Sequence, residues 1–187
     1  MREIKDMPKL EVMRGKVWRF GDNISTTDIT PDEMFMGVPH TLREIVFAAI
    51  KPDWKEKVEP GDCIVGGKNF GLGSHRAIAI EVMKDLGIRC IVADSIARIY
   101  YRTSIAMGFP VFPCPGVSEI FDEGNELELD IHKGLVKNLT TGKIIQGKPY
   151  PQQLLEILEA GGMMSLLVER ARKVSPSSLK FRHKRIR

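Results

Sequence analysis

The sequence contains few cysteines and no long run of apolar residues. Its three cysteines, Cys63, Cys90 and Cys114, are widely separated. An odd number without a close pair supports neither a disulfide framework nor a complete iron–sulfur or zinc site, so we expect reduced, mostly buried thiols. No segment approaches the roughly 18 apolar residues of a membrane helix, and the opening MREIKDMPKLEV has no apolar segment of the signal-peptide type. We therefore expect a cytoplasmic protein with no membrane partner.

Repeats and low-complexity linkers are also missing, which favours a single domain. The chain has 187 residues, 43% of them hydrophobic, enough to bury a core. Its net charge of +4 is concentrated in the last stretch, SPSSLKFRHKRIR. A short basic end of this kind is more typical of a solvated tail or a contact to an acidic partner than of a nucleic-acid reader. We predict a folded domain over residues 1–174, a basic tail over 175–187 and no nucleic-acid partner.

The middle of the chain has the pattern of a βαβ unit. The apolar segments CIVGG (63–67) and IRCIVAD (88–94) are typical of strands that are covered on both faces. Between them, Ile78, Val82 and Leu86 recur every four residues, and Gly87 is a natural helix stop. The order of strand, glycine-containing loop, helix and strand indicates parallel pairing.

The flanking segments extend this pattern to a mixed α/β domain. After residue 125, apolar and polar residues alternate and turn residues separate the segments, which predicts antiparallel strands. Ser95 and Gly108 are placed to begin and end a helix, and Pro151 suits the first turn of another. The expected elements are strands at 16–21 and 109–112, antiparallel strands within 126–147, and helices at 41–50, 95–108 and 149–162.

The loop between the βαβ strands, NFGLGSHR (69–76), combines glycines with polar residues where a helix is expected to begin. Gly71 and Gly73 allow tight turns and close approach to a ligand, while Ser74, His75 and Arg76 are predicted at or just inside the helix N-terminus. Backbone N–H groups, the helix dipole and a guanidinium all favour a carboxylate or phosphate. The alternative is that Ser74 is only an N-cap. Neither a Walker loop nor a Rossmann fingerprint fits the spacing.

Three ordered motifs resemble the small subunits of the isopropylmalate isomerase and homoaconitase branch of the aconitase family. That family has N-[FY]-G-x-G-S-S-R-E, S-[FI]-A-R-I-[FY]-Y-R-N and, near its N-terminus, G-D-N-I-x-T-D. The corresponding stretches here are NFGLGSHR (69–76), SIARIYYRT (95–103) and GDNISTTD (21–28). The similarity covers most of the chain.

The resemblance implies a swivelling β/β/α domain that docks on a large subunit carrying a four-iron, four-sulfur cluster, with no metal or cofactor in this chain. It also implies a small hydroxy-acid substrate. By position, Ser74 is the base that removes a proton next to a carboxylate, Arg76 binds a substrate carboxylate, and Gly71 and Gly73 let the loop approach the substrate. A serine acts as such a base only if its alkoxide is strongly stabilised.

Two departures from the family pattern lie in the same motif. His75 stands where the family has a second serine, and Ala77 replaces a glutamate that orients the arginine. A substrate contact by His75 is the favoured role; acid–base work near neutral pH and an outward, structural position are the alternatives.

A third departure concerns substrate choice. Met34, Phe35 and Met36 form an apolar tip in PDEMFMGVP, where the family carries a segment that selects the substrate's side group. An apolar tip suits an aliphatic substituent better than a third carboxylate, although packing against the partner explains it nearly as well. The expected activity is that of a hydro-lyase acting on 3-isopropylmalate in leucine biosynthesis. The alternatives are a related branched malate such as 2,3-dimethylmalate, homoaconitate, or a noncatalytic regulatory swivel domain.

Overall fold

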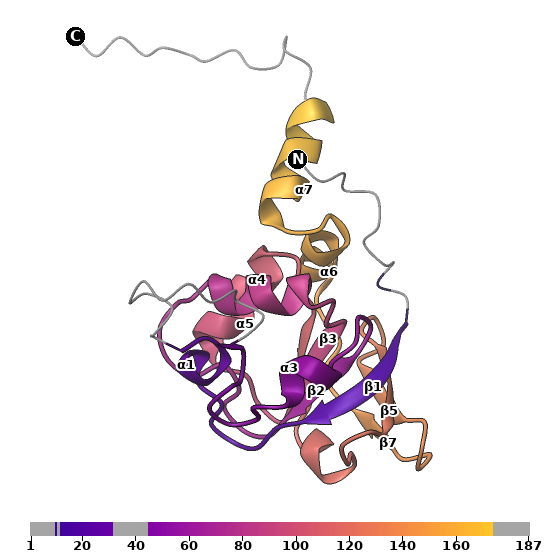
Figure 1. The fold of residues 1–187 in the computed structure, drawn as a ribbon. Helices are drawn as coiled ribbons and strands as arrows, with labels where there is room; N and C mark the ends of the chain where they lie inside the picture. Colours follow the sequence, from indigo (N-terminus) through magenta and orange to yellow (C-terminus); the bar gives the residue numbers. More distant parts are fainter. Residues whose placement is uncertain (1–9, 11, 32–44, 174–187) are drawn as a thin grey trace, which may run out of the picture.

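The computed structural model describes residues 10, 12–31 and 45–173. These residues form a seven-stranded sheet in the order β4-β3-β2-β1-β5-β6-β7 (Figure 1). Neighbouring strands run parallel from β4 to β1 and antiparallel from β1 to β7. The strands are β1 (Met13–Arg19), β2 (Cys63–Gly66), β3 (Cys90–Ala93), β4 (Val111–Pro113), β5 (Glu126–Asp130), β6 (Leu135–Asn138) and β7 (Ile144–Gln146). The predicted mixed α/β class is confirmed.

The predicted βαβ unit is present as β2, α4 (Ile78–Asp85) and β3. Every residue of β2 and β3 is buried, which is why both segments are continuously apolar. The two strands pair in parallel, with Cys63 opposite Cys90. Gly87, with φ of +78°, follows the helix and provides the left-handed residue that commonly ends one.

The second half of the sheet follows from strict alternation. In β5 the side chains of Leu127 and Leu129 are fully buried, while the residues between and beside them are exposed or half-buried. The predicted antiparallel strands are confirmed in β5, β6 and β7. The helix predicted over residues 149–162 is present as α6 (Gln152–Glu159), with Pro151 at its N-cap and not in its first turn. An unpredicted helix, α7 (Met163–Lys173), has no buried residue and extends from the body of the domain (Figure 1).

Two helix predictions are wrong in their details. Of the predicted helix 41–50, residues 41–44 lie outside the described part, and residues 46–50 form turns. Phe47 has φ of +55°, and its ring packs between those of Phe20 and Trp54, at 4.3 and 5.0 Å between centroids. Burial of this aromatic ring therefore outweighs helix continuation. The chain next forms the short helix α3 (Trp54–Lys57).

The helix expected from Ser95 begins later, as α5 (Arg98–Ala106), with Ala97 at its N-cap. Ser95 makes other bonds: its hydroxyl oxygen accepts from the amide of Asn69 at 2.8 Å, and its carbonyl accepts from Phe70 at 2.9 Å. Residues 95–97 are thus extended beside the glycine loop. After β4 comes the 3-10 turn η2 (Val117–Glu119). Nowhere in residues 10, 12–31 and 45–173 is there a helix with the length and apolar character needed to cross a membrane.

Candidate active site

The loop NFGLGSHR leaves the carboxyl end of β2 and runs between two other segments of backbone. On one side Phe70 forms a parallel bridge with Ile96, and on the other Leu72 forms one with Ser25. The amides of Gly71 and Leu72 both donate to the carbonyl of Ile24, at 2.7 and 3.0 Å. The loop is therefore held at its base by backbone hydrogen bonds from segments far apart in the sequence.

Left-handed residues shape the base of the loop. Asn69 and Asn23 both have φ of +58°, and the side-chain Nδ2 of Asn69 donates to the side-chain Oδ1 of Asn23 at 2.9 Å. Gly71 has φ of +79°, and a Cβ there would lie 2.2 Å from the ring of Tyr100. Gly71 is buried, so its close approach is to this aromatic ring. Gly73, with φ of +106°, is exposed at the tip of the loop.

Ser74 and Arg76 come together at the exposed end of the loop. The Nε of Arg76 donates to the Ser74 hydroxyl oxygen at 3.2 Å, and its Nη1 donates to the carbonyl of Thr30 at 3.0 Å. Ser74 and His75 are exposed, whereas Arg76 is half-buried. A guanidinium beside a hydroxyl oxygen stabilises negative charge on it and presents donors to a carboxylate. The pair is suited to binding an anionic substrate.

The predicted position of these residues relative to the helix needs correction. Helix α4 starts at Ile78 with Ala77 as its N-cap, so Ser74, His75 and Arg76 precede the cap. The Ser25–Leu72 bridge keeps the loop extended and delays the helix. The N-cap reading of Ser74 is therefore wrong.

The segment on the other side of the loop, GDNISTTDIT, carries a helix that the sequence interpretation missed. Helix α1 (Thr26–Ile29) begins with a capping box: the amide of Asp28 donates to the Ser25 hydroxyl oxygen at 3.0 Å, and the amide of Ser25 donates to the Asp28 carboxylate at 2.7 Å. The hydroxyl of Thr26 reaches the glycine loop, where it donates to the carbonyl of Ser74 at 3.3 Å. The spacing of Ser25 and Asp28 was the available signal for this helix.

The predicted substrate-specificity residues and the three cysteines remain to be placed. Met34, Phe35 and Met36 lie outside the described residues. Cys63, Cys90 and Cys114 are free and buried. Within the described ranges, no group of three or more His, Cys, Asp or Glu side chains is placed to hold a metal ion. A hydrogen bond to Cys63, at 3.6 Å between sulfurs, together with burial, raises the pKa of the Cys90 thiol well above its ordinary value. These thiols are suited to packing, and they do not fit the cluster that the resemblance implies.

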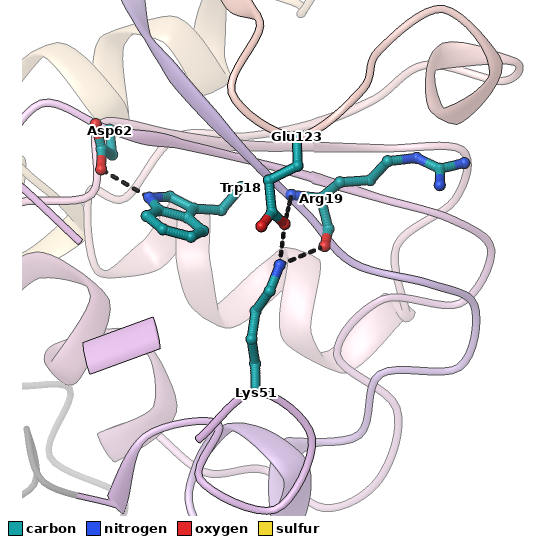
Figure 2. Close-up of polar contacts among 5 residues, drawn as sticks. All are labelled: Trp18, Arg19, Lys51, Asp62 and Glu123. Carbon is teal, nitrogen blue, oxygen red and sulfur yellow. Dashed lines mark hydrogen bonds and ion pairs between the residues drawn. The ribbon is translucent and has the colours of Figure 1, made fainter. Parts of the chain in front are cut away.

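A separate cleft of about 400 Å³ lies beside β1 and includes no residue of the loop 69–76. Figure 2 shows its polar contacts: Lys51 binds the Glu123 carboxylate and donates to the carbonyl of Arg19 at 3.1 Å. The indole of Trp18 donates to Asp62 at 2.7 Å. The contacts of Lys51 attach the chain just after residues 45–50 to β1 and to Glu123, and the Trp18–Asp62 bond attaches the segment before β2 to β1. We assign this cleft no ligand.

The loop lies in a region of the chain that is similar to known proteins. Residues 25–112, which include the loop, match the family model described as the aconitase C-terminal domain. The chain is 46% identical over 157 residues to the isopropylmalate/citramalate isomerase small subunit of Methanocaldococcus jannaschii, covering 83% of this chain and 94% of that protein. It is 47% identical over 159 residues to 3-isopropylmalate dehydratase small subunit 1 of Thermotoga maritima, covering 83% and 95%.

The fold is also similar to a solved structure. The crystal structure of 3-isopropylmalate dehydratase from Methanocaldococcus jannaschii superposes with a TM-score of 0.79 at 31% identity, covering 87% of this chain and 96% of that one.

Proposed function

Because the chain belongs to the aconitase family, in the branch of the 3-isopropylmalate dehydratase small subunits, we propose that it is the small subunit of a two-subunit hydro-lyase acting on 3-isopropylmalate in leucine biosynthesis. The observation that carries the proposal is the pairing of Ser74 with Arg76 on the exposed end of a loop within the matched region. The presence of both residues favours the enzyme over a noncatalytic domain. In this proposal residues 1–174 are the swivel domain and residues 175–187 are a basic tail. The protein is proposed to act in the cytoplasm.

The proposed chemistry uses the two side chains in different roles. Ser74, as the alkoxide, takes a proton from the carbon next to a substrate carboxylate. The electrons of that C–H bond form the double bond, and the C–O bond to the hydroxyl on the neighbouring carbon breaks; the departing hydroxide takes up a proton from solvent and leaves as water. Arg76 binds the substrate carboxylate and stabilises the charge on Ser74. In the rehydration, Ser74 returns a proton to the carbon that lost the hydroxyl, and hydroxide from water adds to the carbon that lost the proton, which completes the isomerisation and restores the Ser74 alkoxide.

The large subunit supplies what this chain lacks in the proposal. By the family resemblance we assign the four-iron, four-sulfur cluster to that subunit, since the buried cysteines here do not fit it. Ser74 and His75 are exposed in the single chain and would be covered by the partner and the substrate. His75 stays a proposed substrate contact. Met34, Phe35 and Met36 stay proposed determinants of an aliphatic substituent.

The test is turnover of the enzyme reconstituted anaerobically from this chain and its large subunit. We expect no turnover from this chain alone, and the highest kcat/KM on 3-isopropylmalate among the candidate substrates, which include 2,3-dimethylmalate and homoaconitate. A clear preference for homoaconitate would overturn the substrate assignment. Absence of turnover on all three, with the cluster intact, would favour the noncatalytic domain.

A further inference from the structure

Thr26 is a buried polar residue directly beneath the exposed end of the glycine loop. It is the first residue of α1, and only 2% of its surface is exposed. Its hydroxyl donates to the carbonyl oxygen of Ser74 at 3.3 Å. We propose that Thr26 is a positioning residue. By binding the carbonyl of Ser74, it holds the Ser74 side chain in the position and orientation that proton abstraction requires. This inference rests on the proposed function for the role of Ser74, but the contact itself does not.

Among the described residues, the backbone bonds from residues 24–26 to the loop end at Leu72, two residues before Ser74. The amides of Gly71 and Leu72 are bound by Ile24, and the carbonyl of Leu72 accepts from the amide of Thr26 at 2.7 Å. Gly73 follows, exposed and flexible in its backbone angles. In the described part of the chain, the Thr26 hydroxyl is the side-chain donor that reaches the peptide of Ser74. Without it, the contacts that hold the tip of the loop within the described residues are those of Arg76.

The same turn of helix also holds Arg76. The hydroxyl of Thr30 donates to the carbonyl of Thr26 at 3.1 Å, and the carbonyl of Thr30 accepts from Nη1 of Arg76 at 3.0 Å. Thr30 is fully buried. Helix α1 therefore holds Ser74 at its first residue and Arg76 just after its last. The 3.2 Å contact between the two side chains is set by this common support.

The contact with Thr30 can orient Arg76 in place of the glutamate that the family motif has at the next position. Position 77 is alanine here, so no carboxylate follows Arg76 to orient it. The carbonyl of Thr30 supplies an acceptor from a different part of the chain. Because an error of about 1 Å in the position of a catalytic group costs on the order of 100-fold in rate, the rigidity of α1 bears directly on turnover.

The test compares Thr26→Val, which keeps the shape and removes the hydroxyl, with Thr26→Ser, which keeps the hydroxyl. In the reconstituted enzyme we expect Thr26→Val to lower kcat by about 10- to 100-fold with little change in KM, because Ser74 is displaced while Arg76 still binds substrate. Thr26→Ser should stay within about 3-fold of the wild type. The matched control is Thr103→Val, whose hydroxyl donates at 3.0 Å to a carbonyl of its own helix.

A second readout needs no activity. Amide hydrogen exchange of residues 73–76 in this chain should become faster in Thr26→Val and remain unchanged in Thr103→Val. Equal kcat in these two variants, or unchanged exchange in Thr26→Val, would overturn the positioning role. If Thr26→Val does not fold, Thr26→Ala provides the same comparison in a smaller side chain. A wild-type enzyme without turnover would overturn the proposed function instead, and the exchange rates would still decide the role of Thr26.

Discussion

The Nε of Arg76 donates a hydrogen bond to the hydroxyl oxygen of Ser74, at 3.2 Å, across one intervening residue. This contact places a permanent positive charge beside an exposed hydroxyl. A serine alkoxide is strongly basic and forms only where such a charge stabilises it. The side chains of Ser74 and Arg76 thus form a single unit. Hydrogen bonds to Thr26 and Thr30, at the two ends of α1, hold this unit in place.

Arg76→Lys should mainly weaken substrate binding. A lysine amino group cannot reproduce the planar fork that donates to Ser74, to Thr30 and to a carboxylate at the same time. We expect KM for 3-isopropylmalate to rise by about 10-fold or more, with a smaller fall in kcat. Arg170→Lys is the control, because Arg170 forms an exposed ion pair with Glu156 on the surface. An unchanged KM in Arg76→Lys would contradict a carboxylate-binding role.

Gly71→Ala should destabilise the fold more than a comparable change elsewhere. A Cβ at this position meets the Tyr100 ring at 2.2 Å and also requires φ of +79°. At Gly124, φ is +85° and a Cβ would meet nothing within 4 Å. We expect a loss of about 3 kcal/mol in the free energy of unfolding for Gly71→Ala and about 1 kcal/mol for Gly124→Ala. Chemical denaturation measures both, and equal losses would rule out the packing role of Gly71.

Alkaline pH should destabilise the protein through its buried thiols. Burial, and secondarily the Asp94 carboxylate, raises the pKa of Cys114 from 9.0 to about 11. The unfolded chain releases this proton first, so the stabilisation is complete below pH 9 and is lost as pH rises towards 11. Linkage gives a loss of about 2 kcal/mol from this group.

Cys114→Ala separates this effect from other titrations. The variant is less stable at neutral pH because it leaves a cavity, but it cannot lose stability by ionising a thiol at this position. The difference in unfolding free energy between variant and wild type should therefore narrow from about pH 9 to pH 11. Denaturation curves across this range measure it. A constant difference would show that Cys114 does not contribute.

Substrate preference should respond to Phe35 and His75 in different ways. Phe35→Arg should shift preference from 3-isopropylmalate towards homoaconitate, because a buried carboxylate needs a partner. Discrimination among alkyl groups should be modest, at about 0.8 kcal/mol per methylene. His75→Ser should change KM for all these malates alike, since they share the malate part. The ratios of kcat/KM measure both effects. A preference unchanged by Phe35→Arg would leave Met34, Phe35 and Met36 as packing residues.

Local patterns were sufficient to predict the central elements. The continuous apolar runs CIVG and CIVA predict the buried strands β2 and β3, and the alternation of apolar and polar residues predicts β5. The site was harder to predict because its contacts join distant segments. The bond from Thr26 to Ser74 spans 48 residues, and that from Arg76 to Thr30 spans 46. No local spacing encodes such pairs. Ser95 was misread for the same reason, since its hydroxyl serves the distant Asn69.

The most direct test of the account is the turnover of 3-isopropylmalate by the enzyme reconstituted with Ser74→Ala. Ser74 is exposed and does not cap α4, so the variant should fold and assemble with the large subunit normally. We predict a fall in kcat of about 1000-fold or more, the scale expected for loss of a general base. Ser165→Ala, on the remote helix α7, should match the wild type. Turnover within a few-fold of the wild type in Ser74→Ala, with the complex intact, would contradict the assignment of Ser74 as the base.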